Sequence, residues 1–135
     1  MESKNKVISG MGFAHIALKA SDFEKSLRFY EALGMTPCLS WGEGDGRITM
    51  LELGDGGILE LFAGGSKEEE CGKFIHFAMS VDDVNDAYIA ALAAGARPKT
   101  EPKVVALDSQ PVKKTLNVAF VYGPDGEELE FFRFV

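Results

Sequence analysis

The chain has 135 residues, of which 46% are hydrophobic and 26% charged, so it is long enough for one compact domain of ordinary globular composition. Its formal net charge of −7 argues against binding to nucleic acid or to an anionic membrane, and no apolar run reaches the roughly 18 residues of a membrane-spanning helix. The N-terminus lacks the apolar core of a signal peptide, and Cys38 and Cys71 lack the spacing of a zinc site. We therefore expect a cytoplasmic protein with two free thiols.

The first half of the chain predicts a strand, a helix and three further strands. Ser21 or Asp22 can cap the helix, and Gly34 suits the residue that ends it. The glycine-rich segments 42–46 and 54–57 are predicted turns. Alternating or compact apolar runs predict the strands Phe13–Lys19, Met35–Trp41, Arg47–Leu53 and Ile58–Phe62. The order of this half is βαβββ.

The second half repeats this order. Asp82 or Asp83 can cap a helix that Gly95 ends. The segment Arg97–Pro111 contains three prolines, and we expect it to be partly extended and partly loop. The remaining predicted strands are Phe74–Ser80, Leu116–Tyr122 and Glu127–Phe134.

The two halves are copies of one pattern. His15 and His76, the only histidines, are 61 residues apart, as are Asp22 and Asp83 and also Gly34 and Gly95. Glu60 and Glu130, on the last predicted strand of each half, are 70 residues apart. The second copy therefore carries nine extra residues, which we expect to form a loop within Lys99–Pro111.

His15, His76, Glu60 and Glu130 are candidate metal ligands. A strand histidine taken alone is more often a core or edge residue, and a glutamate on an edge strand usually faces solvent. Here all four fall at equivalent positions, and each glutamate has large apolar neighbours that make unpaired burial costly. Approximate two-fold symmetry between the halves would bring the four side chains together across one concave surface. Imidazole with carboxylate suits Zn, Ni, Co, Mn or Fe(II).

The motifs around these residues, together with segments 29–35, 59–62 and 124–131, resemble the vicinal oxygen chelate (VOC) superfamily. This superfamily contains glyoxalase I, bleomycin-resistance proteins and ring-cleaving dioxygenases, and the resemblance covers residues 13–134. It implies an α+β fold of two βαβββ modules that form a cup-shaped metal site. We expect one VOC domain over residues 12–135, with module 1 at about 12–64, a linker at about 65–72 and module 2 at about 73–135.

Within the superfamily, the ligand set His15, Glu60, His76 and Glu130 resembles that of bacterial glyoxalase I. Two positions depart from that pattern. Lys19 stands where those enzymes have an arginine, four residues after the first ligand, and Gly64 stands where they have an asparagine. Lysine cannot offer a carboxylate the bidentate contact of arginine, so the resemblance supports the metal chemistry better than glutathione specificity. Lys19 is a candidate substrate-binding residue or a solvated strand end.

The resemblance implies a lactoylglutathione lyase-like metalloenzyme, a carbon–sulfur lyase. It would convert the hemithioacetal of a 2-oxoaldehyde and a thiol, such as methylglyoxal with glutathione, to the 2-hydroxyacyl thioester. One divalent metal per site would stabilise the enediolate, with Glu130 and Glu60 as catalytic carboxylates. We also expect a homodimer with sites at the interface, as in single-domain relatives. Whether the four ligands come from one chain or two is left open by the sequence.

Two other functions remain open. One is a VOC epimerase or another metal-dependent enolising enzyme whose substrate contains no glutathione. The other is a resistance protein that binds a small molecule without turning it over. Metal analysis distinguishes the resistance protein from the metal-dependent enzymes. An assay with methylglyoxal and glutathione distinguishes the lyase from the epimerase or other enolising enzyme.

Overall fold

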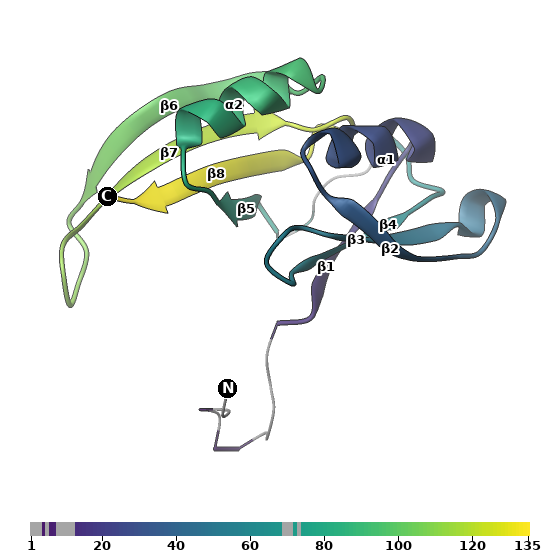
Figure 1. Ribbon diagram of the computed structural model, residues 1–135, viewed down its shortest axis with the longest axis horizontal. Coiled ribbons are helices and arrows are strands. Elements are labelled where there is room, and N and C mark those ends of the chain that lie inside the picture. Colours follow the sequence, from purple (N-terminus) through teal and green to yellow (C-terminus); the bar gives the residue numbers. More distant parts are fainter. Residues whose placement is uncertain (1–3, 5, 8–12, 69–71, 73) are drawn as a thin grey trace.

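The computed structural model describes residues 4, 6–7, 13–68, 72 and 74–135 (Figure 1). Two four-stranded sheets lie side by side, each covered by one helix. Part of the predicted linker, residues 69–71, lies outside the described residues, and so do Cys71 and residue 12. Cys38 is an exposed free thiol. No helix in the described part of the chain has both the length and the apolar character needed to cross a membrane.

Module 1 has the strand order β1-β4-β3-β2, with β1 parallel to β4 and the other pairs antiparallel. Leu59 and Leu61 of β4 are buried in the core on the side of α1, and Asp22 caps α1 by accepting a hydrogen bond from the Lys25 N–H. The elements are β1 His15–Lys19, α1 Phe23–Ala32, β2 Thr36–Trp41, the 3-10 helix η1 Gly44–Gly46, β3 Ile48–Glu52 and β4 Ile58–Phe62.

Module 2 repeats this topology in the order β5-β8-β7-β6, with β5 parallel to β8. Leu129 and Phe131 of β8 are buried in the core on the side of α2, and Asp83 caps α2. Its elements are β5 Phe77–Ser80, α2 Val84–Ala93, β6 Arg97–Leu107, β7 Lys114–Tyr122 and β8 Glu128–Phe134. The prediction of an α+β fold with two βαβββ modules is confirmed.

We expected the nine extra residues of the second copy to form a loop. In the structure they instead lengthen the hairpin of β6 and β7. β6 has 11 residues against 6 in β2, and β7 has 9 against 5 in β3, which together account for the nine additional residues. Pro98 and Pro102 are tolerated inside β6 because it is an edge strand, although its register with β7 shifts around them. The hairpin therefore enlarges the sheet of module 2.

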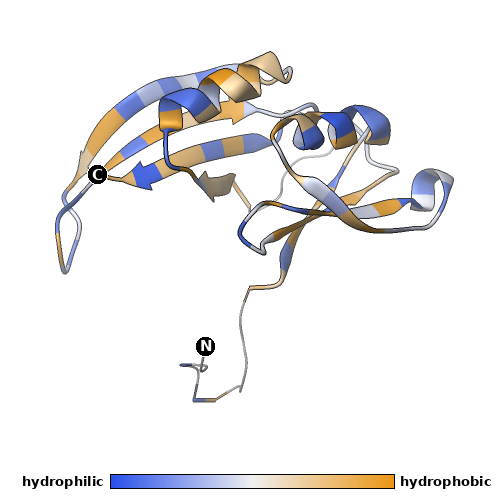
Figure 2. Cartoon of the chain, viewed as in Figure 1, coloured by the Kyte–Doolittle hydropathy of each residue, from blue (hydrophilic) through white to orange (hydrophobic). Residues whose placement is uncertain are grey.

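Both helices lie on the same side of the two sheets and leave the opposite faces uncovered (Figure 1). Hydrophobic residues recur along the strands (Figure 2). On the uncovered face of module 1, Leu39 and Trp41 are 58% and 42% exposed. They pair with Met50 and Ile48 of β3, and Met50 lies opposite Glu60, so all belong to the face that carries this glutamate.

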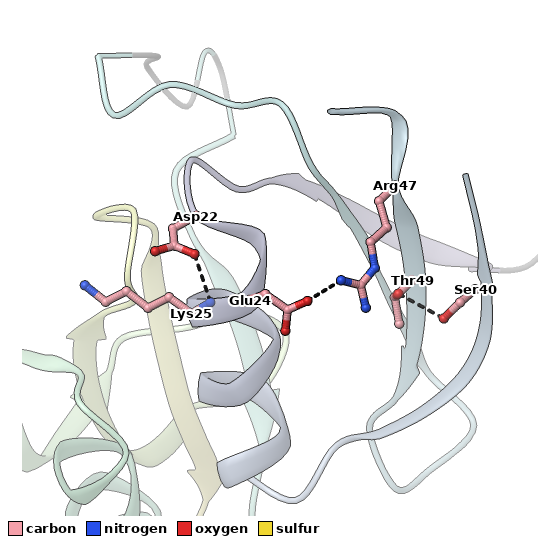
Figure 3. A network of polar contacts seen from close by, with 6 residues as sticks. All are labelled: Asp22, Glu24, Lys25, Ser40, Arg47 and Thr49. Atoms are coloured by element: carbon pink, nitrogen blue, oxygen red, sulfur yellow. Dashed lines mark hydrogen bonds and ion pairs between the residues drawn. The ribbon is translucent and has the colours of Figure 1, made fainter. Parts of the chain in front are cut away.

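Polar contacts fasten α1 to the sheet of its own module (Figure 3). Arg47, which immediately precedes β3, forms an ion pair with Glu24 in the first turn of α1. The Arg47 guanidinium also lies 4.4 Å from the centre of the Phe23 ring. The start of α1 is thus held at a fixed place over the sheet.

A buried polar contact joins the two modules. The Tyr30 hydroxyl on α1 donates to Glu127 Oε2 at 2.7 Å, and neither residue is more than 7% exposed. Beside it, the Ser21 N–H donates to the Asp125 carboxylate at 3.1 Å. Burial, reinforced by the Glu127 carboxylate, raises the pKa of Tyr30 well above its ordinary value. The turn between β7 and β8 is therefore attached to the helix of the other module.

Tyr30→Phe tests this junction. At pH 7 we expect a loss of about 1–3 kcal/mol in unfolding free energy, because Glu127 loses a buried hydrogen-bond donor. Above about pH 10 the unfolded chain releases the tyrosine proton while the folded chain retains it, so wild-type stability falls with rising pH. Denaturant unfolding at several pH values should show a shallower alkaline decline in Tyr30→Phe. An unchanged decline would contradict the assigned role of Tyr30.

Candidate metal centre

The first candidate pair lies on the two parallel strands of module 1. His15 is the first residue of β1, and Ala17 lies opposite Glu60 of β4. Side chains two residues apart on a strand share a face, so His15, Ala17 and Glu60 lie on one face of the sheet. His15 Nε2 is 3.3 Å from Glu60 Oε1. The small Ala17 leaves room for this contact.

Module 2 builds the same pair from the same register. Ala78 of β5 lies opposite Glu130 of β8, and His76 stands two residues before Ala78. His76 Nε2 is 3.2 Å from Glu130 Oε1, and the His76 ring meets the Phe120 ring edge to face at 5.6 Å. The predicted strand from Phe74 is shorter than expected, because β5 begins at Phe77. His76 therefore immediately precedes the strand, whereas His15 begins one.

Both pairs combine a sheltered carboxylate with a more open imidazole. The Glu60 and Glu130 side chains are 11% and 15% exposed, whereas those of His15 and His76 are 39% and 31% exposed. The two carboxylates are therefore largely buried, whereas the two imidazoles are partly exposed to solvent. This places two ligand types at the surface of each uncovered face, where a metal and a substrate could reach them.

The donor atoms of each pair fit one shared metal ion. Metal–nitrogen and metal–oxygen bonds of about 2.1 Å place neighbouring ligands roughly 3.0 Å apart at a right angle and roughly 3.4 Å apart at a tetrahedral angle. The observed separations of 3.3 and 3.2 Å fall between these values. Imidazole nitrogen with carboxylate oxygen is also a donor set that divalent transition metals accept.

The two pairs do not meet within the described residues of one chain. No group of three or more histidine, cysteine, aspartate or glutamate side chains lies close enough there to hold a metal ion. The sequence left open whether the four side chains come from one chain or two, and the described residues of one chain do not bring them together. Each histidine–glutamate pair lies on the sheet of its own module, and we call each pair a candidate half-site.

Lys19 and Gly64 lie at the end of module 1 away from His15. Lys19 is the last residue of β1, exposed and paired in register with Phe62. Gly64 follows β4 at φ +81°, and a Cβ there would lie 2.9 Å from the Asp45 carbonyl oxygen. An asparagine could occupy this position only if that backbone moved.

Sequence reasoning missed a charged group beside Glu130. Glu128, two residues earlier on β8, faces the same side of the sheet and forms an ion pair with Lys99. This hydrogen bond raises the pKa of Lys99. The Lys99 amine also lies 5.6 Å from the centre of the Phe120 ring. The alternation of side chains along β8 could have shown that Glu128 shares a face with Glu130. The position of Lys99 beside it could not be predicted, because the register of β6 with β7 shifts around Pro98 and Pro102.

The sequence pattern of the glyoxalase/bleomycin resistance protein/dioxygenase superfamily matches residues 12–131. The chain belongs to this superfamily. The match spans both modules and all four candidate ligands. No curated protein sequence matches the chain. The superfamily assignment leaves open which of its activities the chain has.

Solved structures share the fold. The chain is 25% identical to SMU.1112c, with a TM-score of 0.69 and coverage of 93% of this chain and 100% of the other. A mutant fosfomycin resistance protein FosX from Listeria monocytogenes, complexed with Mn(II) and 1S,2S-dihydroxypropylphosphonic acid, is 19% identical, with a TM-score of 0.66 and coverage of 89% and 87%. A glyoxalase I mutant from Zea mays is 22% identical, with a TM-score of 0.64, and the match covers 87% of this chain and 43% of the maize chain.

Proposed function

We propose that this protein is a metal-dependent lyase of the glyoxalase I type. It would convert the hemithioacetal of a 2-oxoaldehyde and a thiol, such as methylglyoxal with glutathione, to the 2-hydroxyacyl thioester. The observation that supports this most is the recurrence of one histidine–glutamate pair in the same register of both modules, at 3.3 and 3.2 Å. Membership of the superfamily supports it independently. The cytoplasmic location stays a prediction.

The four side chains would divide the work between binding and proton transfer. A bound divalent metal would supply Lewis-acid stabilisation of the negative charge that develops on two neighbouring substrate oxygens. His15 and His76 would contribute ligand nitrogens. Glu130 would take the proton from the carbon bearing sulfur, and Glu130 or Glu60 would deliver a proton to the adjacent carbonyl carbon. The product then has the same atoms as the substrate, so the reaction needs no redox cofactor.

The site would be completed by a second copy of the chain. The two half-sites lie on different sheets, and the described residues of one chain do not join them. The uncovered face of module 1 exposes Leu39 and Trp41, which a partner could bury. A two-fold dimer would place His15 and Glu60 of one copy against His76 and Glu130 of the other, twice over.

A specific observation favours a second candidate, an enolising enzyme whose substrate contains no glutathione. The position of the asparagine in bacterial glyoxalase I is Gly64, and the Asp45 backbone crowds the space that a side chain there would need. Lys19 replaces the arginine of those enzymes. Activity with methylglyoxal only when glutathione is present would support the first candidate. Metal-dependent exchange of a substrate C–H proton with deuterated water, without glutathione, would support the second.

The first prediction for this function concerns the metal. The purified protein should bind about one divalent transition metal per chain, since two half-sites in each chain make one full site. His76→Ala should lower the affinity sharply because it removes a ligand nitrogen. Titration with Zn²⁺, Ni²⁺, Co²⁺ or Mn²⁺ and analysis by mass spectrometry of the bound metal measure this. Tight stoichiometric binding by a variant lacking both histidines would refute the ligand assignment, and binding of no transition metal would favour the resistance-protein alternative.

The second prediction concerns the base. Glu130→Gln keeps the shape and a neutral ligand oxygen but removes the proton acceptor. We expect kcat to fall by about 10²–10⁴-fold while part of the metal remains bound. Glu128→Gln is the matched control, because it changes the neighbouring carboxylate on the same face of β8. Full activity of Glu130→Gln at full metal occupancy would move the base to another residue.

The third prediction concerns the shared site. His15→Ala and His76→Ala should each be inactive alone, but a mixed dimer has one site lacking both histidines and one intact site. After random subunit exchange, about a quarter of wild-type activity should return. Mixing His15→Ala with Glu60→Ala is the control, since both lesions fall in one half-site and no intact site can form. Absence of recovery, with exchange demonstrated by mass spectrometry, would place all four ligands in one chain.

A further inference from the structure

The repeat creates two equivalent junctions between the modules, and only one of them is filled. In the first junction, the turn between β7 and β8 meets α1. In the second, the turn between β3 and β4 and the equivalent helix α2 line one cavity. The same offsets that relate the two copies relate these contacts, 61 residues for the helices and 70 for the turns. The two junctions can therefore be compared position by position.

Side chains of the chain itself fill the first junction. Tyr30 and Glu127 occupy its centre, and Asp125 accepts hydrogen bonds from the N–H of Ser21 and the hydroxyl of Ser26. The remaining space beside Tyr30 and Glu127 is about 40 Å³. This junction has almost no room for anything else.

The second junction is hollow because its side chains are smaller. Among the residues that line it, Gly57 stands at the position of Glu127 and Ala87 at that of Ser26. The resulting cavity has a volume of about 710 Å³. Its walls combine polar groups of Asp55, Ser80 and Asp82 with apolar side chains, which include Leu33, Met35, Phe77, Met79, Ala87 and Phe131. A cavity of several hundred cubic ångströms lined in this way has the size of a small-molecule site.

We propose that this cavity binds a single-ring aromatic compound that carries a hydrogen-bond donor, such as a phenol or an arylalkyl amine. The filled junction shows the chemistry that this space accommodates, namely an aromatic ring whose hydroxyl donates to a carboxylate. Asp55 and Asp82 are among the residues that line the hollow junction, so their negative charge favours a ligand that carries a donor over an anionic one. The apolar side chains in the wall, such as Leu33, Met35 and Phe131, can contact the ring of such a compound.

The cavity borders the candidate metal ligands without including them, because Ile58, which pairs with His15, and Ala78, which pairs with Glu130, are among its lining residues. His15, Glu60, His76 and Glu130 are not among the described residues that line it. Met50, which pairs with Glu60 on the uncovered face, does not line it either, whereas Met35 and Met79 do. The methionine methyl groups therefore distinguish the cavity from the face that carries the metal ligands. Ligand binding should also proceed without metal and is independent of the proposed lyase activity.

The test is a titration followed by NMR on metal-free protein labelled at the methionine methyl groups. Addition of p-cresol should give saturable shifts of the Met35 and Met79 signals and leave Met50 unchanged. Tyramine, a cation, should bind as well, and the anion 4-hydroxyphenylacetate should bind at least several-fold more weakly. Shifts centred on Met50, no saturable shift at Met35 and Met79, or preference for the anion would each overturn the proposal.

A pair of variants checks the location. Ala87→Phe adds a ring inside the cavity and should weaken p-cresol binding at least tenfold. Ile89→Phe adds a ring to the same helix at a side chain that is 64% exposed and outside the cavity, so binding should be unchanged. Equal binding by a folded Ala87→Phe would overturn the location. If that variant does not fold, the methionine signals of the wild-type protein decide the proposal alone.

Discussion

The parallel pairing of the first and last strands in each module is the constraint on which the candidate site depends. It sets Ala17 opposite Glu60 and Ala78 opposite Glu130. A histidine two residues before each alanine must then reach toward the glutamate across the small side chain between them. A shift of one residue would turn the histidine to the helix-covered face and separate the pair. One backbone register, used twice, therefore gives two nearly equal contacts of 3.3 and 3.2 Å.

The second constraint is the attachment of the modules to each other. Glu127 can fold back toward Tyr30 because residue 123 is glycine, where a Cβ would lie 2.5 Å from the Glu127 carboxyl carbon. The Asp125 N–H donates to the other carboxylate oxygen of Glu127 at 2.7 Å. The turn is thus preorganised before it meets α1. Its attachment holds the two sheets side by side with their uncovered faces open, so each sheet presents its own histidine–glutamate pair.

The sequence predicted what is local and what is repeated. The strand Ile58–Phe62 has the observed bounds, and Asp22 and Asp83 cap the helices, because alternation and capping are written in neighbouring residues. Equivalence between the copies identified the two histidines and the two glutamates, but not the contact of one histidine with one glutamate inside each module. The long strand β6 did not, because prolines lower strand propensity and only its edge position makes them tolerable. The contact of Tyr30 with Glu127, 97 residues away, has no local signal. Nor can a repeat alone tell whether its halves meet within one chain or between two.

Comparison of the two copies also distinguishes residues that serve the uncovered faces from residues that lie between the modules. His15 and His76, and likewise Ala17 and Ala78, are the same in both copies and lie on or beside the uncovered faces. The residues that differ, such as Glu127 against Gly57 and Ser26 against Ala87, lie where the modules meet. Two identical filled junctions would bury a tyrosine and a carboxylate twice, and burial of polar groups is costly unless every one is bonded. The chain satisfies this requirement on one side only, and the smaller side chains opposite leave the cavity between the β3–β4 turn and α2. The difference between the two copies thus explains the cavity, and their similarity explains the two histidine–glutamate pairs.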